Sequence, residues 1–225
     1  MLLNIDLHTH TRRYSRCSIL SPDALCEVAI ERGLNALAIT EHHYQWFEDE
    51  IAALQDRHPA LKLYAGVEIS CNDGHDYVVL GLGPGPHWPP RMPFEKFQSL
   101  LDARPDAFVF IAHCFRHTAS ERGLAELQID GIEIGSYNIL AFQQPEIGPI
   151  QIVREELYHR WQARMGWAPL CNSDGHSRGM IGTFYNQIEA SGGMPPDEIA
   201  LSALLRQHEI RCIRDDDLIR EATRV

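Results

Sequence analysis

Near its start the chain carries the stretch Asn4-Ile5-Asp6-Leu7-His8-Thr9-His10-Thr11. The mostly apolar residues up to Leu7 predict a short strand that ends at the two histidines. Side chains alternate between the two faces of a strand, so we expect His8 and His10 to lie on the same side. Two neighbouring imidazoles form half of a site for a first-row metal ion. The pair alone is a weak signal, and its weight comes from the rest of the chain.

The composition fits one domain with a full core. The chain has 225 residues, of which 44% are hydrophobic, so we expect a single domain over residues 1–225. The 20 basic residues are outnumbered by 31 acidic ones, which gives a formal net charge of -11. This balance argues against a nucleic-acid polymer or an anionic membrane as partner, because both attract a positive surface.

Cysteine usage favours a cytoplasmic protein. The six cysteines are scattered without a Cys-x-x-Cys pair, as expected for reduced thiols rather than for a disulfide framework. We see no signal peptide ahead of the first strand, and no apolar run is long enough to span a bilayer. The oligomeric state cannot be inferred from the sequence.

Strands and helices are predicted to alternate along the whole chain. The predicted strands cover residues 1–7, 34–40, 61–69, 77–82, 107–112, 131–135, 167–171, 184–188 and 210–213. The predicted helices cover residues 22–32, 46–57, 94–104, 150–165 and 197–207. Ser21 and Pro22 are typical of a helix start and Gly33 of a helix end. This order favours a parallel α/β sheet or barrel.

Ligand-type side chains follow most of these strands directly. They are His8, His10, His42, Glu68, His113, Asp174 and His176. In a barrel of parallel strands the carboxyl ends meet on one face, so we expect these side chains to converge. All are ligand types for a divalent metal ion. A carboxylate such as Glu68 can also bridge two cations and hold them about 3.5–4 Å apart.

Taken together, these motifs resemble the PHP (polymerase and histidinol phosphatase) family. The motifs that carry the resemblance are His8-x-His10, Thr40-Glu41-His42, Gly66-Val67-Glu68, Ala112-His113 and Ser173-Asp174-Gly175-His176. The resemblance implies an α/β fold of the TIM-like kind, a distorted seven-stranded (β/α) barrel. It also implies a centre of two or three divalent metal ions and the hydrolysis of phosphoesters.

The resemblance assigns ligands to three metal positions. The first would use His8, His10, Glu68 and Asp174, and the second would use Glu68, His113 and either His75 or Asp76. Of the last two residues, His75 is slightly favoured. The third position would face His42 and His176. Family members often complete it with Asp or His in the loop after the first motif, but here the loop holds Cys17. The third site is therefore weak, empty or completed by Cys17.

The sequence also contains candidate catalytic groups. Arg16, Arg116 and Arg178 lie in loops expected to overhang the site, where guanidinium groups would clamp a phosphate. His176 or His42 would protonate the leaving oxygen. Metal ions would lower the pKa of a bridging water and so generate the attacking hydroxide. Histidine-rich ligation favours Zn²⁺, Mn²⁺ or Fe over Mg²⁺.

The expected substrate is a small phosphorylated metabolite or nucleotide. Two other functions are compatible with the sequence. One is hydrolysis at carbon, as in amidohydrolases, although no lysine stands at a strand end to bridge metal ions as a carbamate. The other is a regulatory metal-binding domain without catalysis, against which the nearly complete ligand set argues. Substitution of Asp174 would separate the enzymes from the binding domain.

Overall fold

The computed structural model of the protein describes residues 1–83, 87–115, 121–141 and 155–223. The strands are β1 Leu2–Thr9, β2 Ala36–His42, β3 Lys62–Ser70, β4 Asp76–Leu80, β5 Phe108–Ala112, β6 Gly131–Gly135, β7 Ala168–Cys171, β8 Phe184–Glu189 and β9 Arg211–Arg214. The helices are α1 Pro22–Glu31, α2 Glu48–Arg57, α3 Phe94–Asp102, α4 Tyr137–Ala141, α5 Glu155–Met165, α6 Glu198–Gln207 and α7 Asp216–Ala222. A short 3₁₀ helix covers Leu124–Glu126.

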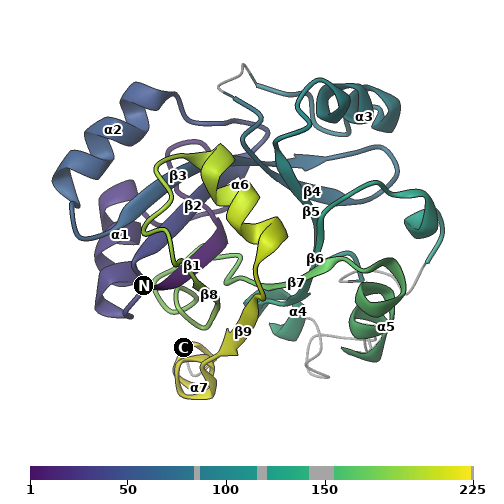
Figure 1. Cartoon of the computed structure of the whole chain (residues 1–225). Coiled ribbons are helices and arrows are strands. Elements are labelled where there is room, and N and C mark those ends of the chain that lie inside the picture. The colour runs from purple at the N-terminus through teal and green to yellow at the C-terminus, as the bar shows by residue number, and fades with distance from the viewer. Residues whose placement is uncertain (84–86, 116–120, 142–154, 224–225) are drawn as a thin grey trace.

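The strands form one curved sheet with the barrel-like shape that the sequence predicts (Figure 1). Its order is β7-β6-β5-β4-β3-β2-β1-β8-β9, so the described sheet has nine strands, as many as the sequence pattern predicts and two more than the resemblance implies. The prediction of parallel strands throughout was wrong. β4 runs antiparallel to both β3 and β5, and β8 runs antiparallel to β1 and β9. A parallel connection needs a long crossover, whereas only a tight turn separates β3 from β4.

Buried asparagines close the barrel between β7 and the pair β1 and β8. Oδ1 of Asn186 accepts a hydrogen bond from the Cys171 amide at 2.9 Å, and its Nδ2 donates to Asn172 Oδ1 at 2.8 Å. The same Asn172 oxygen accepts from the Leu7 amide at 3.0 Å. Side chains therefore pair with backbone groups that no neighbouring strand satisfies, as buried polar groups require.

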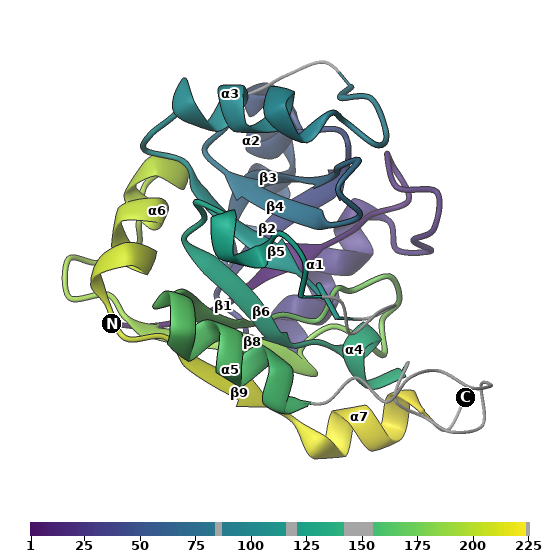
Figure 2. The same ribbon diagram turned by 90° about the vertical axis from the view of Figure 1, so that its right-hand side faces the viewer.

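Apolar side chains fill both the barrel and the layers outside it. The interior cluster includes Leu3 of β1, Phe110 of β5 and Leu201 of α6. Outside, α1 and α2 cover β2 and β3, while α3 and α5 cover β4 to β6 (Figures 1 and 2). The segment before α6 meets the start of β3, where Tyr64 donates to the Pro195 carbonyl. The opposite end of the barrel, where the parallel strands finish, is left for polar groups.

A register irregularity in β1 affects the direction in which the His8 side chain points. β1 pairs with β2 in parallel, but the register shifts between Asp6 and Thr9. Leu3, Ile5 and Leu7 alternate regularly into the interior cluster, but the ring of the next residue, His8, also lies near the interior Phe110, 6.4 Å between centroids. A bulge of this kind redirects side chains at the end of a strand. Regular alternation alone does not predict it.

Helix α1 forms as its sequence predicts. Ser21 caps the helix, since its side chain accepts a hydrogen bond from the Ala24 amide, and Pro22 occupies the first turn. Gly33 follows with φ of 77°, a conformation that favours glycine. Two helices, α4 and α7, were not predicted, and residues 150–154 of the helix predicted at 150–165 lie outside the described residues. None of the helices in the described ranges combines the length and apolar character needed to cross a membrane.

The asparagine closure gives a stability prediction. Replacing Asn186 with Ala removes two buried hydrogen bonds, the one from the Cys171 amide and the one to Asn172 Oδ1. We expect the free energy of unfolding to fall by about 2–4 kcal/mol, measured by urea denaturation. Gln187→Ala is the matched control, because Gln187 is next in sequence and only half-buried, and should cost less than about 1 kcal/mol. Equal losses in the two variants would contradict the role given to Asn186.

Candidate metal centre

A cavity of about 430 Å³ lies at the barrel end where the parallel strands finish. It is lined by Cys17, His42, Glu68, Ser70, Asp76, His113, Asn138, Asp174, His176 and Met180. His8 and His10 are fully buried beside it and contact Glu68 and Asp174. The structure thus brings together seven ligand-type residues that are far apart in the sequence, as the parallel strand ends predict.

Three groups of ligand atoms can each surround one ion. Within each group all ligand atoms lie within 4.8 Å of one another. The groups are His8 with Glu68 and His113, His8 with His10 and Asp174, and His10 with His42 and His176. Two of the histidines occur in more than one group, so the three positions adjoin. Such adjoining positions are the geometry of a multinuclear centre.

The buried ring nitrogens of the first position point at a common centre. Nε2 of His8 and Nε2 of His10 are buried and have no hydrogen-bond partner among the described residues. Carboxylate oxygens of Glu68 and Asp174 lie 3.3–3.5 Å from these nitrogens. Unpartnered buried donors and acceptors are rare in proteins unless an ion or water joins them. The donor set therefore fits a divalent metal ion with mixed nitrogen and oxygen ligands.

Charge compensation supports the same conclusion. Burial opposes ionisation of Glu68 and Asp174, but the surrounding histidines outweigh it and hold both carboxyl pKa values well below their usual range. In turn, burial lowers the His42 pKa but the Glu68 carboxylate outweighs it and raises the value to about 11. Burial lowers the pKa of His10 to about 3. Two buried carboxylates need positive charge nearby, which imidazolium protons or divalent cations can supply.

Glu133 orients two of the candidate ligands. It is fully buried on β6, and its Oε1 lies 3.2 Å from Nδ1 of His8. Its Oε2 accepts a hydrogen bond from the His113 amide at 3.1 Å. A carboxylate bound to the second ring nitrogen fixes the tautomer of a ligating histidine and turns the other nitrogen to the metal. The sequence analysis missed Glu133, because it lies in the middle of β6 and not at a strand end like the other acids.

Of the two residues considered for the second metal position, Asp76 lines the cavity and His75 does not. Asp76 lines the cavity, with Oδ2 3.8 Å from Nδ1 of His113, whereas the ring of His75 packs near Tyr77, 6.4 Å between centroids. The geometry therefore favours Asp76 over His75 as the candidate ligand. The reason is the antiparallel direction of β4, which brings its first residue opposite Ser70 at the end of β3.

The third position contains the residues expected there. The ring centroids of His42 and His176 lie 4.4 Å and 4.5 Å from that of His10. Cys17 lines the same cavity as His42 and His176. Burial opposes ionisation of this thiol, but the hydrogen bonds with His176 and His42 outweigh it and lower the Cys17 pKa to about 6. The loop that holds Cys17 thus reaches the site.

Two candidate ligands have strained backbones. His113 has φ of 28° and Asp174 has φ of 50°, the left-handed region that residues with a side chain rarely adopt. Nδ2 of Asn138 on α4 donates to Asp174 Oδ2 at 2.5 Å and so helps to hold that carboxylate. Strain of this kind is typical of residues whose position serves a site. Neither α4 nor Asn138 carried a sequence signal that could have identified it.

The described arginines do not line the cavity. Arg16 is exposed on the loop beside Cys17. Arg178 does not line the cavity and forms an ion pair with Glu31 of α1 at 2.8 Å, so its role as a phosphate clamp stays a prediction. Arg116 lies outside the described residues. Within the described chain the cavity lining holds neither Arg nor Lys.

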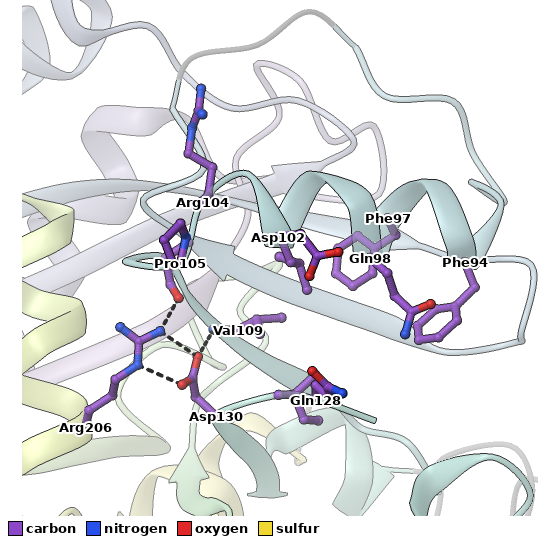
Figure 3. Close-up of a pocket in the computed structure, with 13 residues that line it drawn as sticks. Phe94, Phe97, Gln98, Asp102, Arg104, Pro105, Val109, Gln128, Asp130 and Arg206 are labelled. Atoms are coloured by element: carbon purple, nitrogen blue, oxygen red, sulfur yellow. Dashed lines mark hydrogen bonds and ion pairs between the residues drawn. The ribbon is translucent and has the colours of Figure 1, made fainter. Parts of the chain in front are cut away.

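A second cavity, of about 500 Å³, lies outside the barrel between α3 and β5 (Figure 3). Its lining includes Phe97 and Val109 and an ion pair between Arg206 and Asp130 at 2.8 Å. Arg206 also donates to the Asp106 and Ala107 carbonyls and so ties α6 to β5. These contacts are structural, and the cavity holds none of the metal-ligand groups.

Metal binding should stabilise the fold. We expect protein stripped with a chelator to melt at a lower temperature than the same protein with added Zn²⁺ or Mn²⁺. An ion at a hundred times its dissociation constant adds about 2.7 kcal/mol. Differential scanning calorimetry across a metal titration measures the shift. The shift should shrink in Asp174→Asn, which loses a ligand charge, and identical melting with and without metal would contradict the assignment.

Comparisons with solved structures find the same fold in other proteins. The chain resembles PsfC from Pseudomonas syringae PB-5123, with 15% identity, a TM-score of 0.69 and coverage of 99% of this chain and 96% of that one. It also resembles a provisionally assigned metal-dependent phosphoesterase from Bifidobacterium adolescentis, with 16% identity, a TM-score of 0.57 and coverage of 97% and 94%. An amidohydrolase from Chromobacterium violaceum with bound sulfate gives 18% identity, a TM-score of 0.59 and coverage of 95% and 99%.

At these identities the structural likenesses show the fold alone. No curated protein sequence matches the chain. The sequence profile of the PHP domain, however, matches residues 6–173. This span contains the motifs from the first histidine pair to Ser173, and it confirms the family suggested by the sequence. The chain belongs to the PHP domain family.

Proposed function

We propose that this protein is a metal-dependent phosphoesterase, a phosphatase or phosphodiesterase that uses two or three divalent ions. The supporting observation is the Glu68 carboxylate, which lies between metal positions. Its Oε1 is 3.2 Å from Nε2 of His113, and its Oε2 is 3.5 Å and 3.4 Å from Nε2 of His8 and His10. A carboxylate so placed can bridge two ions at the spacing used for displacement at phosphorus.

Each residue of the centre has a role in this proposal. The first ion would be held by His8, His10, Glu68 and Asp174, and the second by Glu68, His113 and Asp76. Bound cations would lower the pKa of a coordinated water and stabilise negative charge on phosphoryl oxygens. The mixture of histidine and carboxylate ligands supports Zn²⁺, Mn²⁺ or Fe.

The leaving group would receive its proton from a histidine at the cavity. His176 and His42 both line it and are only partly exposed. Burial lowers the His176 pKa, but hydrogen bonds with Cys17 and the nearby Asp174 carboxylate outweigh it and raise the value. A protonated imidazole next to the departing oxygen can act as a general acid.

The proposed substrate is a small phosphorylated metabolite or nucleotide. Three carboxylates line the cavity and the described lining offers no Arg or Lys, so bound cations would have to supply the positive charge for a phosphate. The net charge of -11 disfavours a long nucleic acid, although a short one can still reach the site. We further propose that residues 1–225 act as one domain in the cytoplasm, supported by the single sheet and by free cysteines.

Hydrolysis at carbon is the less favoured alternative. The chain has only two lysines, Lys62 and Lys96. Lys62 starts β3 at the far end from Glu68 and donates to the Pro196 carbonyl, while Lys96 lies on α3. Neither lysine can therefore bridge metal ions at the cavity as a carbamate. In this chain the Glu68 carboxylate would be the bridging ligand instead. This difference favours the phosphoesterase.

A paired measurement of metal content and turnover tests the proposal. We expect two or three ions per chain by mass spectrometry and hydrolysis of p-nitrophenyl phosphate or bis-p-nitrophenyl phosphate that a chelator abolishes. The preferred substrate would separate monoesterase from diesterase, and a DNA oligonucleotide would test nuclease activity. Absence of turnover on all of these with Zn²⁺ or Mn²⁺ bound would overturn the proposal in favour of a metal-binding domain.

A substitution links the activity to the bridging carboxylate. Glu68→Gln removes the bridging charge while keeping the side-chain shape, so kcat should fall at least about a hundredfold. Glu27→Gln is the matched control, because Glu27 is exposed on α1, and should leave kcat unchanged. Steady-state kinetics on both variants, with circular dichroism to confirm folding, gives the answer. Wild-type kcat in Glu68→Gln would exclude a bridging role.

A further inference from the structure

A fully buried carboxylate near the end of β2, Glu41, has no role in the metal centre described above. Four hydrogen bonds reach its two oxygens. Thr11 donates two of them, from its amide at 3.1 Å and from its hydroxyl at 2.5 Å. Nε1 of Trp46 donates to Oε1 at 3.1 Å, and Oγ of Ser15 donates to Oε2 at 2.5 Å. An amide and an indole N–H can only donate, one to each oxygen here, so a carboxylate satisfies all four partners.

Ser15 connects this carboxylate with the ring of His10. Its hydroxyl oxygen is buried, lies 3.4 Å from Nδ1 of His10 and accepts a hydrogen bond from the His42 amide at 3.1 Å. A hydroxyl has one proton to donate and two lone pairs that accept. The proton goes to the Glu41 carboxylate and one lone pair to the His42 amide. The second lone pair is therefore left for a proton on Nδ1 of His10.

The position of that proton decides what the other nitrogen of the His10 ring can do. A neutral imidazole carries one proton, so a proton on Nδ1 leaves a lone pair on Nε2. Nε2 is buried, 3.3 Å from Asp174 Oδ1 and 3.4 Å from Glu68 Oε2. A cation among these atoms needs the lone pair, because a ligating histidine must be unprotonated at the nitrogen that binds. Glu133 acts on Nδ1 of His8 in the same way, without a hydroxyl in between.

We propose that Glu41 and Ser15 are positioning residues that hold His10 in the tautomer able to bind the first metal ion. The inference rests on the metal centre of the proposed phosphoesterase. The relay runs from the Glu41 carboxylate through the Ser15 hydroxyl to Nδ1 of the ring. It opposes a proton on Nε2, which the nearby Asp174 carboxylate would otherwise attract. Hydrogen-bond partners that act on a ligating histidine in this way change metal affinity by about 10–100-fold.

Two serines of the loop after β1 give a matched pair of variants. Ser15→Ala removes the hydroxyl beside the His10 ring. Ser18→Ala removes another buried hydroxyl, which donates to the carbonyl oxygens of His10 and His176 at 2.9 Å and 3.2 Å. Because both variants lose contacts of the same loop, a merely structural role predicts similar effects.

Zinc affinity distinguishes the relay from a structural role. We expect Ser15→Ala to lose at least about tenfold in affinity for one Zn²⁺ per chain, and Ser18→Ala to keep the wild-type affinity. Competition with a chromophoric chelator, on the full chain stripped of metal, measures both. A Ser15→Ala variant with wild-type affinity, or an equal loss in Ser18→Ala, would overturn the proposal.

Nuclear magnetic resonance reports the state of the ring without any turnover. In the Zn²⁺-loaded chain with isotope-labelled histidine, we expect a ring that is bound through Nε2 and carries its proton on Nδ1. The signal of that proton should shift, and exchange faster with water, in Ser15→Ala but not in Ser18→Ala. A spectrum in which no ring signal responds to Ser15→Ala would contradict the relay.

A double-mutant cycle tests whether Glu41 and Ser15 act as one unit. Glu41→Gln places an amide nitrogen against an N–H donor whichever way it is turned, so circular dichroism must first confirm the fold. The variant that combines Glu41→Gln with Ser15→Ala should then lose no more Zn²⁺ affinity than the weaker-binding single variant. Additive losses would overturn the relay. If Glu41→Gln does not fold, the two serine variants decide the question.

Turnover of p-nitrophenyl phosphate and bis-p-nitrophenyl phosphate on the same samples separates this inference from the proposed function. Hydrolysis by the wild type, together with undiminished Zn²⁺ affinity in Ser15→Ala, would refute the relay and leave the phosphoesterase intact. No hydrolysis by the wild type, together with the selective loss of affinity in Ser15→Ala, would refute the phosphoesterase and leave the relay intact.

Discussion

The structure depends on the compensation of two buried carboxylates, Glu68 and Asp174. Both are almost completely inaccessible, at 2% and 1% exposure, and an uncompensated charge in such a place would be prohibitive. Five histidines surround them, and the carboxylates hold the pKa of His8 well above its usual range although burial opposes this. A divalent cation can replace those protons. The end of the barrel therefore holds two buried carboxylates whose negative charge bound metal ions can neutralise.

Much of this arrangement could be predicted from the sequence, because each candidate ligand belongs to a short motif at the end of an apolar strand. Periodicity locates the strand ends, and the barrel brings them together. Strand direction is not encoded in the same way. The reversal of β4 depends on pairing with β3 and β5, so the sequence favoured His75 although Asp76 is the residue that lines the cavity. The bulge before His8 was equally invisible, because it follows from pairing with β2.

The supporting residues were harder to predict, because their roles arise from contacts over long sequence distances. Glu133 gains its role only when β6 lies beside β5 and near β1, where it reaches both His8 and the His113 amide. Arg178 has the right chemistry for a phosphate but pairs with Glu31 of α1. Composition and motif show which chemistry a residue can perform. Tertiary contacts decide whether it is available for that chemistry.

The candidate ligands also lie on both sides of the seam at which the barrel closes. There the backbone of Thr9 pairs with that of Gly175, so that the amide of His10 donates to the Gly175 carbonyl at 3.1 Å. One side of the seam supplies the first histidine pair and the other supplies Asp174. A cation bound between the histidine pair and Asp174 would therefore link the first strand of the barrel to the segment that follows β7. Ion binding would then add to the asparagine and backbone contacts that close the barrel, and loss of the ion would loosen the molecule along that line first.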